Sequence, residues 1–554
     1  MDFQRLFLFL IFSFSVLLLW DAWQRHEHPV PQVQHTQTAS QASTAPIETA
    51  GVKASADQSI ESSKTANATN QQQTISGKNI EVKTDLFLAR INTVGGSLNG
   101  LELLKHRDAI DKSKPFVLFE HKKSSTYIAQ TGLLGNGLPT HNTIFTLPAG
   151  QNLELAQDKK ELQVSLSATT QTGIHVIKTY TFHRGSYVID ISYKIENEGK
   201  TPLSTSAYFQ LVRDSEKPKE DTKFISTYTG PAVYTEKDKF QKVSFKDIEK
   251  NKKDYPESAN NGWIAILQHY FVAAWLPQGQ TKREFYTRQL DTDLFSAGVI
   301  LPVPTITPGK TASLDVSLYA GPAQTKLDKI APGLGLTVDY GWLTVIATPL
   351  FWLLAVLHGG VGNWGLAIIL LTAMIKLVFF PLSAASYRSM AKMRVVAPKL
   401  EKIKKQYEGD RERLHKAMME LYKKEKINPL GGCLPIVIQI PIFISLYWAI
   451  LSSVELRHAP FYGWIQDLSA PDPYYVLPLI MSVSMFVQTK LNPKPADPMQ
   501  AKVMQIMPLV FGFVFFFFPA GLVLYSVVNN VLSITQQWVI TRSTDAKSKN
   551  TSKN

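Results

Sequence analysis

Residues 363–381 read NWGLAIILLTAMIKLVFFP, and Lys376 is the only charged residue among them. An apolar run of this length predicts a helix that spans a membrane. A charge inside a span costs roughly 2.5 to 3.5 kcal/mol on insertion scales, so it usually faces protein or water and marks a functional path. The alternative is that the flexible lysine snorkels to the interface near Pro381, five residues further along.

The whole chain has the composition of a membrane protein with a large extramembrane part: 554 residues, 45% hydrophobic, with a formal net charge of +13. Its first apolar segment, residues 3–20, is followed by Asp21 without a small-x-small cleavage site. We therefore expect residues 1–22 to remain as a signal-anchor helix rather than to be removed as a signal peptide. Cys433 is the only cysteine, so the chain has no disulfide framework.

Charge asymmetry sets the expected topology. Five further transmembrane helices are predicted, at residues 363–382, 429–451, 474–489, 503–518 and 522–540. Between Ser386 and Asn428, 13 lysine or arginine residues stand against six acidic ones. The positive-inside rule places this loop in the cytoplasm. With the anchor, the pattern predicts six spans, both termini in the cytoplasm, and a basic cytoplasmic tail at residues 542–554.

Residues 340–357 are also apolar enough to pass for a span. Counting them would reverse the topology of everything downstream and place the basic loop outside. Pro349 near the centre and the tryptophans Trp342 and Trp352 suit a helix that lies in the interface. We therefore predict an interfacial helix here, at the start of a membrane core that covers residues 336–541.

The part between the anchor and the core divides into two. Residues 23–78 are rich in Gln, Thr, Ser and Ala and predict a disordered linker. Residues 79–335 contain short runs of period two separated by turn residues, which predict a periplasmic antiparallel β-sandwich. His175, His183 and His269 lie in strand-like runs without metal-ligand or triad spacing, so neither a metal site nor catalysis is indicated.

The basic loop at residues 386–428 is patterned as two helices. Apolar residues recur at spacings of three and four on both sides of Gly409 and Asp410, which predicts a helical hairpin with a narrow apolar seam. Its outer faces are strongly basic and suit docking to anionic lipid, RNA or an acidic protein. The alternative is that these charges serve orientation alone. The candidate docking residues are Lys399, Lys402, Lys404, Lys405, Arg411 and Arg413.

Polar residues gather on the last predicted span. Ser526, Asn530, Ser533 and Gln537 follow helical spacing and form one stripe. Thr372 lies one turn before Lys376, and Gln439 adds an amide to the third span. Such side chains can simply hydrogen-bond helices together, at around 0.6 kcal/mol each. Together with the lysine they favour a water-containing cavity within the membrane.

Several short motifs in this region are characteristic. They are GNWG (362–365), MAKMR (390–394), NPLGGCLP (428–435), PIFISLY (441–447), SVELRHAPF (453–461), DLSAPDPYY (467–475), DPMQ (497–500) and GLVLY (521–525). In this order they closely resemble the YidC family of bacterial inner-membrane protein insertases. The anchor and the large β domain are similar to its Gram-negative form, in which that domain is a supersandwich similar to sugar mutarotases.

The resemblance implies that five spans enclose a hydrophilic groove open to the cytoplasm and to lipid, with one basic residue in the second span. That residue is Lys376 here, where many members carry arginine, and Lys lacks the planar fork of Arg. Tyr525 is the aromatic contact in the groove, since Ser526 stands where relatives often have a second tyrosine. The implied groove residues are Lys376, Thr372, Gln439, Tyr525, Ser526, Asn530 and Ser533.

The resemblance also implies that the protein is an insertase and folding chaperone. It would move hydrophobic segments of nascent membrane proteins through the groove into the inner membrane, alone or with the Sec translocon. Client helices would leave the groove along an apolar slide formed by Leu434, Pro435, Phe443, Met507 and Val514. Expected partners are nascent membrane proteins, the Sec translocon with its accessory membrane proteins, ribosomes, signal-recognition targeting factors and membrane lipid, but not DNA. No cofactor and no enzymatic activity are expected. No nucleotide is implied, since no glycine-rich phosphate loop is present.

Two other classes remain as alternatives. A transporter or channel would show inverted repeats and paired intramembrane charges, and none is evident. A membrane-anchored enzyme that modifies sugars would carry clustered carboxylates or histidines in the β domain.

Overall fold

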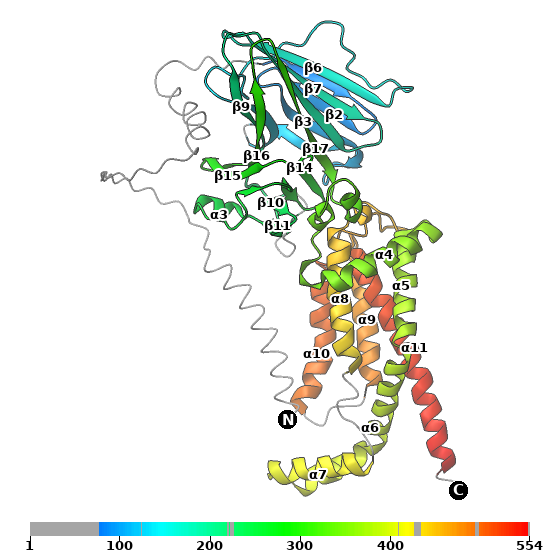
Figure 1. The fold of residues 1–554 in the computed structure, drawn as a ribbon. Helices are drawn as coiled ribbons and strands as arrows, with labels where there is room; N and C mark the ends of the chain where they lie inside the picture. Colours follow the sequence, from blue (N-terminus) through cyan, green and yellow to red (C-terminus); the bar gives the residue numbers. More distant parts are fainter. Residues whose placement is uncertain are drawn as a thin grey trace, which may run out of the picture. The chain divides into compact units, whose positions relative to one another are not determined.

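The computed structural model describes residues 77–551, except 123, 219–220, 222–226, 408, 426–433 and 493–497. The predicted anchor and nearly all of the predicted linker lie outside the described residues. The described chain consists of a β-sandwich followed by a set of helices (Figure 1). This confirms the predicted order of a large β domain followed by a helical part.

The β-sandwich is built from two antiparallel sheets. The first has nine strands in the order β1-β2-β3-β4-β5-β9-β16-β15-β12, and the second has eight in the order β11-β10-β13-β14-β17-β8-β7-β6. The strands of the first half are β1 (Asn79–Lys83), β2 (Phe87–Asn92), β3 (Ser97–Arg107), β4 (Pro115–His121), β5 (Thr126–Leu134), β6 (Glu161–Thr169), β7 (Ile174–His183), β8 (Val188–Asn197) and β9 (Leu203–Asp214). Those of the second are β10 (Gly230–Thr235), β11 (Lys239–Lys242), β12 (Ser258–Ala259), β13 (Trp263–Gln268), β14 (Phe271–Pro277), β15 (Arg283–Asp291), β16 (Leu294–Ile306) and β17 (Thr311–Pro322), with the short helix α3 (Phe245–Glu249) after β11.

Alternation of apolar and polar residues explains most of these strands. Along β7, every second residue from Ile174 to Phe182 is buried, because successive side chains point to opposite faces of a sheet. β13 and β14 are instead buried at every position. Ile264 and Ile266 belong to the core between the two sheets, whereas Ala265 and Leu267 belong to a second apolar cluster that includes residues of the helices.

Three 3-10 turns lead from the last strand to the helices: η1 (Thr325–Lys329), η2 (Leu334–Thr337) and η3 (Gly341–Leu343). The helices are α4 (Thr344–Val361), α5 (Trp364–Val378), α6 (Phe380–Gln406), α7 (Arg411–Lys424), α8 (Leu434–Ser452), α9 (Val476–Leu491), α10 (Pro498–Phe515) and α11 (Ala520–Thr551), with η5 (Val454–Leu456) after α8. α5, α8, α9, α10 and α11 each overlap one predicted span. α11 continues as helix beyond residue 540, through most of the predicted tail.

α4 differs from its neighbours in direction, since it lies crosswise to α5 and α8 (Figure 1). Among the described residues it is the one helix long and apolar enough to cross a membrane by itself, and Trp352 on it is exposed. Length and composition therefore do not distinguish an interfacial helix from a span here. The number of transmembrane helices stays a prediction.

The predicted span that carries Lys376 is not one straight helix. α5 and α6 meet at Phe379 and are bent by 67° relative to each other. Pro381 in the first turn of α6 explains the break, because proline has no N–H to donate back to α5. α6 therefore carries both the end of the predicted span and the first arm of the predicted hairpin.

Candidate functional site

Lys376 lies in the last turn of α5 and points toward α11. Its Nζ donates a hydrogen bond to Oγ of Ser533 at 2.8 Å. The Ser533 hydroxyl in turn donates to the carbonyl of Asn529, one turn earlier on α11. The lysine is thus half-buried against a helix 157 residues away in sequence instead of extending along its own helix.

A small cavity of about 20 Å³ lies beside the lysine, between α5, α6 and α8. That volume holds about one water molecule. It is lined by Ile375, Lys376, Phe379, Leu382, Ser383, Pro435, Ile438 and Gln439. The lining is mixed, with one ammonium, one amide and one hydroxyl among apolar side chains.

A second polar contact joins α8 to α11. Nε2 of Gln439 donates a hydrogen bond to the hydroxyl of Tyr525, and Tyr525 is only 2% exposed. Gln439 also lines the cavity beside Lys376. Two of the polar residues predicted on different spans, Gln439 and Lys376, therefore border the same space.

The other predicted polar residues have different partners. The buried hydroxyls of Thr372 and Ser526 donate to carbonyls of their own helices, at Ile368 (2.6 Å) and Leu522 (2.9 Å). Asn530 points to α9, where its Nδ2 lies 3.1 Å from Oγ of Ser484. The predicted stripe on α11 is therefore divided between two neighbouring helices.

One residue near Lys376 was not predicted from the sequence as a site residue. The side chain of Tyr387 on α6 lies beside Ser533 and is 5% exposed. Tyr387 follows Lys376 by eleven residues, or about three helical turns, so helical spacing places both on one face. The bend at Phe379 removes that simple relation, and only the packing of α6 on α11 brings the tyrosine to this site.

The predicted slide residues lie on α8 and α10. Phe443 packs edge-on against Phe515, with ring centroids 6.0 Å apart. Pro435 lines the small cavity, Met507 is half-buried and Val514 is exposed. Leu434 is the first residue of α8, but its side chain lies outside the described part of the structure.

The predicted hairpin seam is present. Val396 and Leu400 of α6 form a small apolar cluster with residues of α7 that include Met418 and Leu421. Asp410 caps α7 by accepting a hydrogen bond from the backbone N–H of Arg413. Gly409, in the turn before it, has a positive φ of 96°.

The basic residues of the hairpin differ in their surroundings. Lys399 of α6 forms an ion pair with Glu425 after α7, at 2.7 Å, and Arg413 pairs with Asp410 at 3.2 Å. Lys402 and Lys405 are exposed and Lys404 is half-buried, while the side chain of Arg411 is outside the described part. The exposed lysines are available to a partner, whereas Lys399 joins the two arms.

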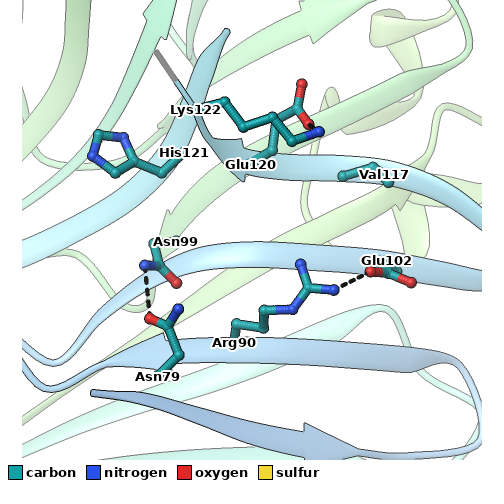
Figure 2. A pocket seen from close by; sticks show the side chains of 8 residues that line it. All are labelled: Asn79, Arg90, Asn99, Glu102, Val117, Glu120, His121 and Lys122. Atoms are coloured by element: carbon teal, nitrogen blue, oxygen red, sulfur yellow. Dashed lines mark hydrogen bonds and ion pairs between the residues drawn. The ribbon is translucent and has the colours of Figure 1, made fainter. Parts of the chain in front are cut away.

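A larger hollow, of about 290 Å³, lies on the outer face of strands β1 to β4 (Figure 2). It is lined by Asn79, Arg90, Asn99, Glu102, Val117, Glu120, His121 and Lys122. Its charges are largely paired within the hollow, Arg90 with Glu102 and Lys122 with Glu120. The arrangement is that of a polar sheet face exposed to solvent.

Comparison with known proteins covers nearly the whole described chain. Residues 79–353 match the family model of the YidC periplasmic domain, and residues 356–548 match that of the 60Kd inner membrane protein. The chain is 54% identical to the membrane protein insertase YidC of Nitrosospira multiformis over 567 residues, covering 100% of this chain and 99% of the relative. It is 53% identical to that of Methylobacillus flagellatus, with 98% of both chains covered.

Solved structures give a weaker likeness. A crystal structure of an active YidC insertase with its first transmembrane domain resolved covers 83% of this chain and 92% of its own, at 20% identity and a TM-score of 0.38. The assignment rests instead on the two family models and on the relatives at more than 50% identity. The chain belongs to the YidC family of membrane protein insertases, which are not enzymes.

Proposed function

We propose that this insertase moves client segments along a polar path between α5, α8 and α11, with Lys376 as its charged centre. The observation that carries the proposal is the hydrogen bond from Lys376 to Ser533. It directs the ammonium group of α5 toward the polar residues of α11 and away from lipid. Thr372, Ser526 and Asn530 belong to the same path, together with Gln439 and Tyr525.

The path would act by lowering a desolvation cost. The short extracytoplasmic tail of a client carries polar and often acidic groups, and each costs several kcal/mol to place in hydrocarbon. Water held beside Lys376, and the ammonium itself, offer such groups partial solvation inside the membrane. The cavity of about 20 Å³ would have to widen to admit a chain.

Apolar client residues would leave the path along α8 and α10. Phe443 and Val514 present apolar surface there, so an incoming helix exchanges protein contacts for lipid contacts at little cost. Leu434, Pro435 and Met507 extend the same slide in the proposal. No energy source is required, because burial of the client helix in lipid is itself favourable.

The proposed topology has six spans with both termini in the cytoplasm. The protein lies in the bacterial inner membrane, with its β-sandwich in the periplasm, and α4 lies flat in the outer leaflet. The basic surplus between Ser386 and Asn428 supports this orientation. The crosswise direction of α4 relative to α5 also supports it (Figure 1).

Clients are nascent membrane proteins. Beyond these, we propose that the hairpin α6–α7 docks ribosomes and signal-recognition targeting factors, and that the helical core works both alone and beside the Sec translocon. The exposed lysines Lys402 and Lys405 support a docking role. The charges of these lysines lie on an ordered helical surface. Orientation of the protein in the membrane would not by itself require such a surface.

The test is insertion of a single-span client with an acidic tail by full-length protein. Lys376→Arg should insert the client at close to the wild-type rate, because it keeps the charge. Lys376→Ala and Lys376→Glu should reduce insertion by about tenfold or more, and a client with an uncharged tail should be less affected. Equal insertion of the acidic client by the wild type, Ala and Glu proteins would reject the role of the charge.

A further inference from the structure

Four aromatic side chains, hereafter the aromatic cluster, lie between α8 and the corner that joins α10 to α11: Phe443, Tyr447, Phe515 and Phe518. Phe443 packs edge-on against Phe515 and Phe518, with ring centroids 6.0 and 6.5 Å apart. Tyr447 packs edge-on against Phe518 at 5.4 Å, and the rings of Phe515 and Phe518 are 5.5 Å apart. The four rings therefore bridge α8 to the corner.

The aromatic cluster follows the polar path along one face of α8. Gln439, Phe443 and Tyr447 are spaced by four residues, so helical periodicity places them on the same face. With a rise of about 1.5 Å per residue, the two aromatic residues lie about 6 and about 12 Å further along α8 than Gln439. Gln439 itself borders the cavity beside Lys376 and contacts Tyr525. The cluster thus begins where these polar contacts end.

The end of α8 beyond the cluster is the end nearer to the β-sandwich. In its last turn, Oγ of Ser452 donates to the carbonyl of Asp339 at 2.7 Å, in the segment that follows the last strand. The sandwich belongs to the part of the chain that matches a periplasmic domain. Water that enters the path from the cytoplasm would therefore meet the aromatic cluster before it could reach the periplasm.

The surroundings of the aromatic cluster are apolar. Phe515 is 5% exposed, and the other three rings pack against the apolar core of the helices to which it belongs. In the same core, Leu446 of α8 and Leu522 of α11 are 2% and 0% exposed. Phenylalanine rings have no group that could replace the water around an ion, and a narrow apolar constriction excludes water itself. A layer of rings along about two helical turns is therefore a barrier to ions.

We propose that the aromatic cluster seals the periplasmic end of the polar path against ions when no client is bound. A continuous column of water in the path would otherwise conduct protons and other small ions across the membrane. Single ring contacts are weak, so the tail of a client can displace the rings, and the rings can close behind it. The inference deepens the proposed function and rests on it, since a seal is needed only if the path holds water.

The first test measures proton flux into liposomes that contain the full-length protein and no client. A potassium gradient with valinomycin drives protons inward, and an enclosed pH-sensitive dye reports their flux above that of empty liposomes. Phe515→Ala combined with Phe518→Ala should raise the flux per protein about tenfold. Leucine at both positions should keep the flux within about twofold of the wild type, because the layer stays apolar and largely filled.

Phe513→Ala combined with Phe517→Ala is the matched control. These two rings contact each other at 5.6 Å near the same end of α10, but they are 62% and 38% exposed. The control removes the same ring volume outside the aromatic cluster, so its flux should stay within about twofold of the wild type. Wild-type flux in the alanine pair at Phe515 and Phe518 would overturn the inference, as would an equal rise in the control. If that alanine pair does not accumulate, Phe518→Ala alone is judged by the same flux.

The second test separates the seal from the path. With Cys433→Ser as background, Ser383→Cys places a thiol in the wall of the cavity beside Lys376. A small, cationic, membrane-impermeant thiol reagent is added to inner-membrane vesicles of either orientation. From the cytoplasmic side it should modify the thiol whether or not the rings are present. From the periplasmic side it should do so only in the protein that also carries Phe515→Ala and Phe518→Ala.

The outcomes of the second test are distinct. Equal modification from the periplasmic side with and without the two rings would overturn the seal. A thiol that stays unmodified from the cytoplasmic side would instead count against water in the proposed path, and the proton flux would then decide on the seal alone.

Discussion

Gln439 on α8 and Tyr525 on α11 are joined by a hydrogen bond, although 86 residues separate them. Tyr525 is almost fully buried, so its hydroxyl has no access to bulk water. The pair connects α8 with α11, the helix that carries Ser533. It therefore couples the two sides of the proposed path.

Tyr525→Phe should destabilise the helical core, since it leaves the Gln439 amide without this partner. We expect a loss of about 1 kcal/mol in unfolding free energy, in the range of hydrogen bonds within membranes. Combining it with Gln439→Leu should cost less than the sum of the two single changes, because neither partner is then left unpaired. Denaturant unfolding in detergent measures all three, and strictly additive losses would contradict the coupling.

Neutralising the exposed lysines of the hairpin should weaken docking without unfolding it. Lys402→Gln with Lys405→Gln leaves the seam residues Leu400 and Leu421 in place. Binding of ribosomes to reconstituted protein should fall severalfold and should lose much of its dependence on salt, because exposed charges are screened within about 10 Å at 0.1 M salt.

Glu401→Gln with Glu412→Gln is the matched control for the hairpin, since both acids are exposed on the same two helices. This control should bind at least as well as the wild type. Equal binding by the lysine variant, at every salt concentration, would mean that the basic face serves orientation only.

Cysteines introduced at Gly359, near the end of α4, and at Lys402 on α6 should report opposite sides of the membrane. With Cys433→Ser as background, a membrane-impermeant reagent added to the periplasmic side should modify the first and not the second. Protection of the cysteine at Gly359, with modification only after the cytoplasmic side is opened, would make α4 a span and refute the six-span topology.

Lys178 gives the β-sandwich a dependence on pH. It is 0% exposed and donates to the carbonyl of Gly95 at 2.6 Å, and its Nζ lies 4.9 Å from the ring centroid of Phe145. Burial lowers the pKa of its amine from 10.5 to about 7. Between these two pH values the unfolded chain binds a proton that the folded chain does not, so the free energy of unfolding rises with pH.

The expected gain from Lys178 is about 2 kcal/mol between pH 7 and pH 9, at 1.36 kcal/mol per pKa unit. Urea unfolding of the full chain in detergent, followed by the circular dichroism of its strands, measures it against Lys178→Met. The variant should lack this part of the pH dependence. Parallel pH profiles for the two proteins would show that the lysine is charged in the folded state.

Much of the architecture could be predicted from the sequence, because it depends on local pattern. Alternating apolar residues specify strands such as β7, and the apolar runs specify α5, α8, α9, α10 and α11. The seam around Leu400 follows from helical spacing. The motifs from GNWG to GLVLY indicated the insertase family. The family models and the relatives confirm this family. Membership in it excludes the two alternatives, a transporter and a sugar-modifying enzyme.

Contacts between distant segments were decided only by the tertiary structure. The sequence places Ser533 and Asn530 on one stripe, yet they face α5 and α9 respectively, because the helices packed around α11 determine which polar group each residue meets. The same holds for Tyr387, which lies beside Ser533, 146 residues further along the chain. It also holds for Arg457, whose Nη1 donates to the carbonyl of Arg107, 350 residues away. Periodicity fixes which face of an element is apolar, whereas the neighbour of each side chain depends on how whole elements pack.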